Sequence, residues 1–114
     1  MTTGMRTLIY PVKDLETSKA IIGALLGAEP VVDQPYYVQF SANGMDIGLD
    51  PSGHRYGQAG PIPYWDVEDI TAAVDALRKA GANEVESVKD VGGGVLVAVL
   101  TDADGNPIGV RQGA

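Results

Sequence analysis

An internal repeat limits the folds open to this chain. The stretch "ANGMDIGLD", which begins at Ala42, recurs as "ADGNPIGVR", which begins at Ala103. Gly27 likewise has a counterpart in Gly81. The matching residues follow the same order in both copies and lie 54 to 61 positions apart. With 114 residues in all, each copy is too short to bury a core of its own. We therefore expect one domain made of two copies of a single module.

Both copies predict the same succession of elements. An apolar run precedes an aspartate that can cap a helix, and a glycine suited to the left-handed C′ position follows that helix. Two strands then surround a tight turn, Asn43-Gly44 in the first copy and Asp104-Gly105 in the second. With a short extended piece after each helix, the pattern is βαβββ twice, an α+β fold. The single domain 1–114 then comprises a first module at 5–50, a linker loop at 51–60 and a second module at 61–112.

Charge and composition exclude several classes of partner. The net charge is −7, so the phosphates of nucleic acid or of an anionic membrane surface would be repelled. The chain has no cysteine, which excludes disulfides and thiolate metal sites. No stretch approaches the ~18 apolar residues of a membrane span, and "MTTGMRTL" lacks the pattern of a signal peptide. We expect a cytoplasmic protein that binds neither nucleic acid nor membrane.

The motifs within this pattern resemble the vicinal oxygen chelate superfamily. "VKDL" follows the first strand and "DADGNP" forms the last hairpin of the tandem βαβββ arrangement. The superfamily includes glyoxalase I, extradiol dioxygenases, fosfomycin-resistance transferases and bleomycin-resistance proteins, and the resemblance spans Arg6 to Gln112. It implies that the modules form a curled, cleft-enclosing sheet and that the chain pairs as a homodimer.

The resemblance also implies where a metal would be held. Enzymes of the superfamily usually bind a divalent metal with His and Glu side chains from the first and last strands of each module. The matching positions here are Thr7, Gly48, Ile62 and Gly109. None of them offers a carboxylate or an imidazole, and a tight divalent site needs several such donors. We therefore expect no metal and no other cofactor, with the two glycines leaving room for an organic ligand.

Strand alternation predicts which side chains face the cleft. The expected lining is apolar, with tyrosine, glutamine, aspartate and arginine at its walls, which suits a small organic molecule. Trp65 is expected on the opposite face, in the core. The residues predicted to contact the ligand are Thr7, Tyr37, Gln39, Gly48, Tyr64, Asp66, Gly109 and Arg111.

Asp66 is the candidate catalytic residue. Beside Tyr64 and apolar neighbours, its carboxylate could have a raised pKa and act as a general base. The alternative is a solvated carboxylate or an ion pair with Arg111. His54 is the one histidine, and a metal or catalytic role would need a partner such as Asp50. An isolated loop histidine is usually solvent-exposed.

Three functions remain open on these grounds. The first is a metal-free small-molecule-binding protein of the glyoxalase/bleomycin-resistance type, whose ligand is apolar or aromatic; the acidic chain favours a cationic ligand over an anionic one. The second is an enzyme of the same superfamily, a lyase or dioxygenase. It would use Asp66 and a tyrosine as an acid–base pair, or a metal held by Asp50, His54 and Asp66. The third is a structural or regulatory dimer without a ligand, which no motif supports. The missing metal ligands favour the first.

Overall fold

The computed structural model describes residues 1–52 and 60–113, and within them it has the predicted α+β fold. The candidate residue His54 lies outside the described residues. The elements in order are β1 (Thr2–Pro11), α1 (Leu15–Leu26), β2 (Val32–Gln34), β3 (Tyr37–Ala42), β4 (Met45–Asp50), β5 (Ile62–Val67), α2 (Ile70–Lys79), β6 (Asn83–Asp90), β7 (Leu96–Thr101) and β8 (Pro107–Gln112).

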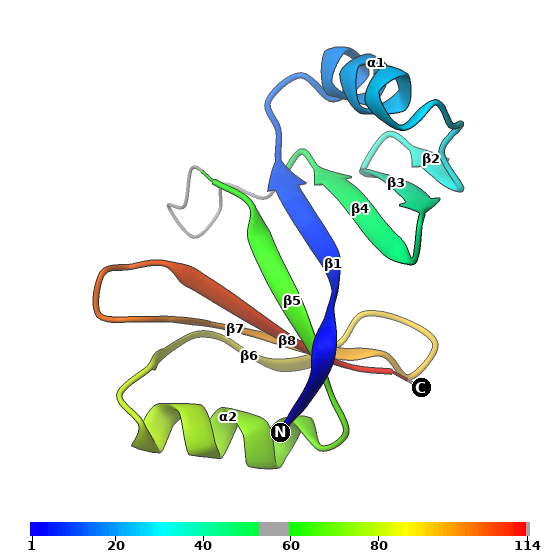
Figure 1. The fold of residues 1–114 in the computed structure, drawn as a ribbon. Coiled ribbons are helices and arrows are strands. Elements are labelled where there is room, and N and C mark those ends of the chain that lie inside the picture. Colours follow the sequence, from blue (N-terminus) through cyan, green and yellow to red (C-terminus); the bar gives the residue numbers. More distant parts are fainter. Residues whose placement is uncertain (53–59, 114) are drawn as a thin grey trace. The chain divides into compact units, whose positions relative to one another are not determined.

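Two compact units make up the chain. The first unit is Arg6–Pro61, and the second unit is Ile62–Ala114 together with Met1–Met5. Strand β1 therefore contributes its beginning to the second unit and its remainder to the first unit. A helix, a strand and a hairpin follow in the same order in both units, which confirms the repeated βαβββ pattern (Figure 1). The short piece expected after each helix is found only in the first unit, because β2 has three residues and β6 has eight.

The sheet of the first unit has the order β2-β3-β4-β1. β1 and β4 are parallel, whereas β3 is antiparallel to both of its neighbours. Helix α1 covers one face of this sheet, where Val12, Val38, Phe40 and Leu49 are buried. Strand alternation explains the core, because Val38 and Phe40 are two residues apart on β3.

Helix α1 begins and ends where the sequence predicts. The Asp14 side chain accepts a hydrogen bond from the Thr17 backbone N–H at 3.0 Å. At the other end Gly27 has a φ of 63°, and its N–H donates to the Gly23 carbonyl. The left-handed conformation is the reason for a glycine at this position. No residue of α1 is fully buried, and neither described helix is long and apolar enough to cross a membrane.

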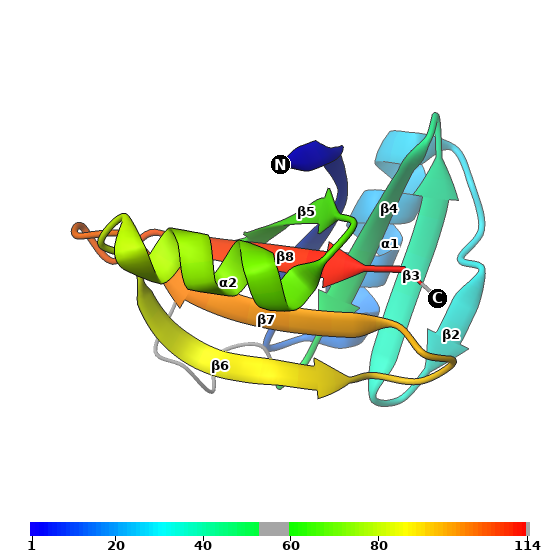
Figure 2. The same ribbon diagram turned by 90° about the horizontal axis from the view of Figure 1, so that it is seen from below.

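In the second unit the sheet order is β1-β5-β8-β7-β6, with β5 parallel to β8. Helix α2 lies along β8, β7 and β6 (Figure 2). The Asp69 side chain caps it by accepting from the Ala72 N–H at 3.1 Å, and the Gln112 side chain accepts from the Ile70 N–H at 2.9 Å. The buried cluster beneath the helix consists of Val67, Ile70, Ala73, Val74, Ala98, Leu100 and Val110.

The expectation that Trp65 lies in the core is wrong. Its cross-strand partner Val110 is buried under α2, but Trp65 itself is 38% exposed. Alternation along β5 decides which face a side chain lies on, and it does not decide how far the covering helix extends over that face.

The two hairpins close differently. Asn43 and Gly44 have φ values of 55° and 79°, the left-handed pair that a two-residue hairpin turn requires. In the second hairpin Gly105 is left-handed, with a φ of 82°, and its N–H donates to the Asp102 carbonyl at 3.1 Å. The predicted hairpin is therefore present, as a longer loop with a single left-handed residue.

Candidate functional site

Four of the predicted site residues share one face of the first unit. Val38 and Phe40 point toward α1, so Tyr37 and Gln39, which alternate with them, lie on the opposite face. Gly48 is the cross-strand partner of both Ile9 and Gln39, which puts it on that face too. Thr7 lies two residues before Ile9 and pairs with Asp46.

The space above Gly48 is filled by the protein itself. A Cβ atom at Gly48 would overlap the Tyr37 hydroxyl and would lie 2.5 Å from the Ile9 Cδ1 atom. The Tyr37 hydroxyl is held there by a hydrogen bond of 3.0 Å with the Gln39 Oε1 atom. The expectation that this glycine leaves room for a ligand is therefore wrong, because a neighbouring side chain occupies the room.

The second unit repeats this arrangement. Tyr64 pairs with Gly109, just as Ile9 pairs with Gly48 in the first unit. A Cβ at Gly109 would lie 2.6 to 2.8 Å from atoms of the Tyr64 ring. The predicted free space is therefore absent here as well. Each glycine thus allows a tyrosine to approach the backbone closely, through the hydroxyl end of Tyr37 at Gly48 and through the ring of Tyr64 at Gly109.

Asp66 and Arg111 complete the second set of predicted residues. They are cross-strand partners on the face opposite α2, and Arg111 Nη1 lies 3.6 Å from Asp66 Oδ1. The Oδ1 atom is shielded from solvent. The backbone carbonyl of Asp66 accepts a hydrogen bond from the Thr2 hydroxyl at 2.6 Å. Of the two interpretations of Asp66, the structure supports the ion pair with Arg111.

A further carboxylate on this face is Glu86, which the sequence analysis did not identify. It pairs with Val99 on β7, and its carboxylate accepts a hydrogen bond from Lys89 Nζ at 2.8 Å. Register irregularities flank it on both sides, and such bulges redirect side chains near functional sites. Nothing in "NEVESVKD" distinguishes Glu86 from Glu84, since the bulges appear only once the strand is paired.

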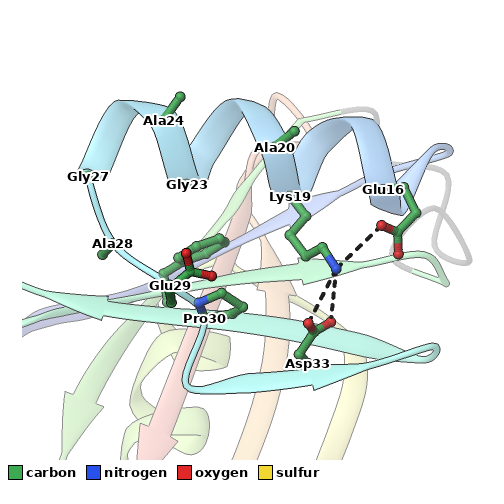
Figure 3. A pocket seen from close by; sticks show the side chains of 11 residues that line it. Glu16, Lys19, Ala20, Gly23, Ala24, Gly27, Ala28, Glu29, Pro30 and Asp33 are labelled. Atoms are coloured by element: carbon green, nitrogen blue, oxygen red, sulfur yellow. Dashed lines mark hydrogen bonds and ion pairs between the residues drawn. The ribbon is translucent and has the colours of Figure 1, made fainter.

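A separate cavity of about 490 Å³ lies between α1 and the segment that leads into β2 (Figure 3). Lys19 Nζ lies 3.3 Å from both Glu16 Oε2 and Asp33 Oδ1. The hydrogen bonds to Asp33 and then to Glu16 raise the pKa of Lys19. Lys19 thus joins α1 to β2. None of the predicted site residues lines this cavity.

The residues at the family's metal positions do not fit a metal. Thr7 and Ile62 provide no carboxylate or imidazole, and tyrosine rings cover the two glycines. Within residues 1–52 and 60–113, no three His, Cys, Asp or Glu side chains lie close enough together to hold an ion. We therefore derive no chemistry from a metal at these positions.

Solved structures show the same fold at low sequence identity. A glyoxalase/bleomycin resistance protein/dioxygenase superfamily member from Vibrio splendidus 12B01 has a TM-score of 0.71 and 18% identity, with 95% of this chain and 97% of that chain covered. Methylmalonyl-CoA epimerase from Mycobacterium tuberculosis has a TM-score of 0.71 and 18% identity, with 99% and 89% covered.

The Mn(II)-bound glyoxalase from Novosphingobium aromaticivorans has a TM-score of 0.73 and 20% identity, with 97% of this chain but 39% of that chain covered. No curated protein matches the chain in sequence. The sequence model of the Glyoxalase/Bleomycin resistance protein/Dioxygenase superfamily matches residues 4–110. The chain therefore belongs to the glyoxalase/bleomycin resistance protein/dioxygenase superfamily.

Proposed function

We propose that this chain is a small-molecule-binding protein of the glyoxalase/bleomycin-resistance type that acts without a metal at the family positions. The observation that carries the proposal is the pair of tyrosine rings over Gly48 and Gly109. Where an enzyme of the family would present metal ligands, this chain presents aromatic surface. Tyrosine rings offer apolar contact and a polar hydroxyl together, which suits an apolar or aromatic ligand.

An enzymatic alternative would use Asp66 as a general base. That role needs a carboxylate within reach of a substrate proton. The ion pair with Arg111 favours a different role, in which Asp66 orients the guanidinium. We therefore assign Asp66 and Arg111 to ligand binding and positioning.

The metal-free part of the proposal is tested by calorimetry. Chelator-treated protein is titrated with Zn²⁺, Ni²⁺, Mn²⁺ and Fe²⁺, and elemental analysis is run on the untreated protein. We expect no stoichiometric metal and no saturable heat. One equivalent of metal bound with submicromolar affinity would contradict the proposal, because it would require a donor set that the family positions do not supply.

The ligand-binding part is tested with the tyrosines as reporters. Protein with isotope-labelled tyrosine is screened by NMR against small aromatic compounds, and hits are repeated on Tyr64→Ala and Tyr37→Ala. Tyr36→Ala is the matched control, since Tyr36 is strongly exposed at the edge of the first unit. We expect hits to shift the Tyr37 or Tyr64 signals and to weaken in the corresponding variant. Hits that bind all variants equally, or a screen without hits, would refute this part.

A further inference from the structure

The turn that joins β3 to β4 places an asparagine directly before a glycine (Figure 1). We propose that Asn43 in this turn is a site of spontaneous covalent modification, at which the side-chain amide is lost and aspartate and isoaspartate are formed. The inference goes beyond the proposed function and depends on no ligand, because the reaction takes place between two neighbouring residues and water.

The reaction joins the Gly44 backbone nitrogen to the Asn43 side chain. The nitrogen loses its proton and bonds to Cγ of Asn43, while the bond from Cγ to Nδ2 breaks. Nδ2 leaves as ammonia and carries the proton away, so that a succinimide ring remains. Water then breaks one bond between the ring nitrogen and a carbonyl carbon. Breaking the bond at Cγ gives aspartate, and breaking the bond at the main-chain carbonyl gives isoaspartate, in which the main chain runs through Cγ.

Both reacting groups are accessible in this turn, since Asn43 and Gly44 are exposed. Among the described residues, the Asn43 amide makes no hydrogen bond and the Gly44 N–H donates none. A Cβ at Gly44 would meet no atom of residues 1–52 and 60–113 within 4 Å. Rotation of Asn43 about its own bonds is therefore sufficient to bring Cγ to the nitrogen.

The backbone of the turn can make this rotation at low cost. Asn43 has a φ of 55° and is the only non-glycine residue with a positive φ in the described part of the chain. That conformation is unfavourable for a residue with a Cβ, so leaving it is not opposed by local geometry. The pair Ala42–Met45 closes the turn, and the tips of hairpins open with little free energy. The next pair is also joined through its side chains, by a hydrogen bond of 2.6 Å from Ser41 to Asp46. Opening is therefore confined to the tip.

The other two of the chain's three asparagines are protected. Asn106 donates a side-chain hydrogen bond to Asp102 Oδ2 at 2.9 Å, and the nitrogen of the following Pro107 has no proton to lose. Asn83 begins β6 and pairs with Thr101 on β7. The residue after Asn83 carries a long side chain, which hinders the approach of its nitrogen. Asn43 is thus the asparagine with the fewest obstacles to the reaction.

The second hairpin provides a comparison within the same molecule. Asp104 precedes Gly105, and this pair can form the same ring, with water leaving in place of ammonia. Here, however, the Gly105 N–H donates to the Asp102 carbonyl at 3.1 Å. The Asp102 carboxylate also accepts from the N–H groups of Asp104 and Asn106, each at 2.9 Å. Several hydrogen bonds must break before this ring can form, whereas the first turn has none at the reacting nitrogen.

The modification changes a hairpin that carries predicted site residues. Isoaspartate adds one carbon to the main chain between Ala42 and Met45, so the closing pair cannot keep its register. Tyr37, Gln39 and Gly48 lie further along the same two strands. Either product also adds one negative charge to a chain of net charge −7, so anion exchange separates aged protein from fresh protein.

The proposal is tested by peptide mapping with mass spectrometry on full-length protein aged in neutral and in mildly alkaline buffer. Isoaspartate is measured by methylation with a protein isoaspartyl methyltransferase. Each site is followed both in the native protein and in protein unfolded in guanidinium chloride. Comparing each site with itself removes the difference between ammonia and water as leaving groups.

In the native protein we expect Asn43 to be deamidated about tenfold or more faster than Asn83, and faster at higher pH because the Gly44 nitrogen must lose its proton. Folding should slow the reaction at Asp104 about tenfold more than at Asn43, because hydrogen bonds must break only at the second turn. If native Asn83 reacts as fast as Asn43, or if folding slows Asn43 as much as Asp104, the proposal is overturned.

Two variants confirm the assignment. Asn43→Gly removes the amide and keeps the turn, because glycine also adopts positive φ and a Gly-Gly pair suits this type of hairpin. It should abolish isoaspartate at this turn. Asn83→Gln is the matched control and should leave the yield of isoaspartate as in wild type. A wild-type yield from Asn43→Gly would overturn the proposal. Should a variant fail to fold, the comparison of sites within the wild-type protein still decides.

Discussion

Single glycines decide where a tyrosine side chain can lie against the backbone in each unit. Gly48 and Gly109 have the same role in their units, because each allows an aromatic ring from a neighbouring strand to lie against the backbone. In the first unit the ring comes from Tyr37, and in the second it comes from the directly paired Tyr64. A larger residue at either glycine would have to displace that ring.

Gly109→Ala tests this contact. The added Cβ would lie 2.6 Å from the Tyr64 ring, so the ring or the strand must shift. We expect the free energy of unfolding to fall by about 1–3 kcal/mol, the usual cost of overpacking. Urea denaturation measures this change.

The matched control is Gly60→Ala, since a Cβ there would meet no atom of the described residues within 4 Å. In a Tyr64→Ala background the Gly109→Ala substitution should cost little, because the ring that it meets is gone. An equal loss in both backgrounds would show that Gly109 is needed for another reason.

At the scale of elements, local hydrogen bonds set the ends of helices and hairpins. Asp14 and Asp69 cap the two helices with the same geometry, and Gln112 adds a bond to α2 from the end of β8. Asp102 closes the second hairpin, because its carboxylate accepts from the Asn106 side chain and from the N–H groups of Asp104 and Asn106.

The Asp102 turn makes the stability of the protein depend on pH. The hydrogen bonds from the Asn106 side chain and then its backbone hold the pKa of Asp102 below the ordinary value of 3.8. The ionised group therefore stabilises the fold above pH 3.8, and this contribution is lost as the pH falls through the lower folded-state pKa.

Urea denaturation between about pH 5 and pH 2 measures this effect. We expect Asp102→Asn to lose less stability than wild type over this range. The control is Asp104→Asn in the same turn. The Asp104 carboxylate accepts no hydrogen bond in the described part of the chain, so this variant should lose as much stability as wild type over the same pH range. If Asp102→Asn follows wild type as well, the turn is not a source of the acid sensitivity.

At the scale of the whole molecule, the resemblance to the superfamily predicts a homodimer. Each unit also exposes large apolar side chains, among them Trp65 in the second unit and Leu25 and Tyr36 in the first. Aromatic and aliphatic surface of this kind is typical of protein interfaces. Sedimentation equilibrium should give twice the chain mass of 11.9 kDa. If the measured mass at micromolar protein concentration is that of one chain, the prediction is wrong.

The sequence alone determined the features that depend on neighbours along the chain. The repeat, the caps at Asp14 and Asp69, and the hairpin glycines all act over a few residues, so the pattern of residue types is sufficient to predict them. Strand alternation likewise assigned Tyr37 and Gln39 to one face and Val38 and Phe40 to the other.

Only the tertiary structure decided what lies across from each residue. Tyr64 is 45 positions from Gly109, yet strand pairing puts its ring on that glycine. Pairing and bulges likewise make Glu86 a nearly buried partner of Lys89, and the limited extent of α2 leaves Trp65 exposed. Register, bulges and helix coverage depend on the free energy of packing among distant segments. A single strand read by itself carries no information about them.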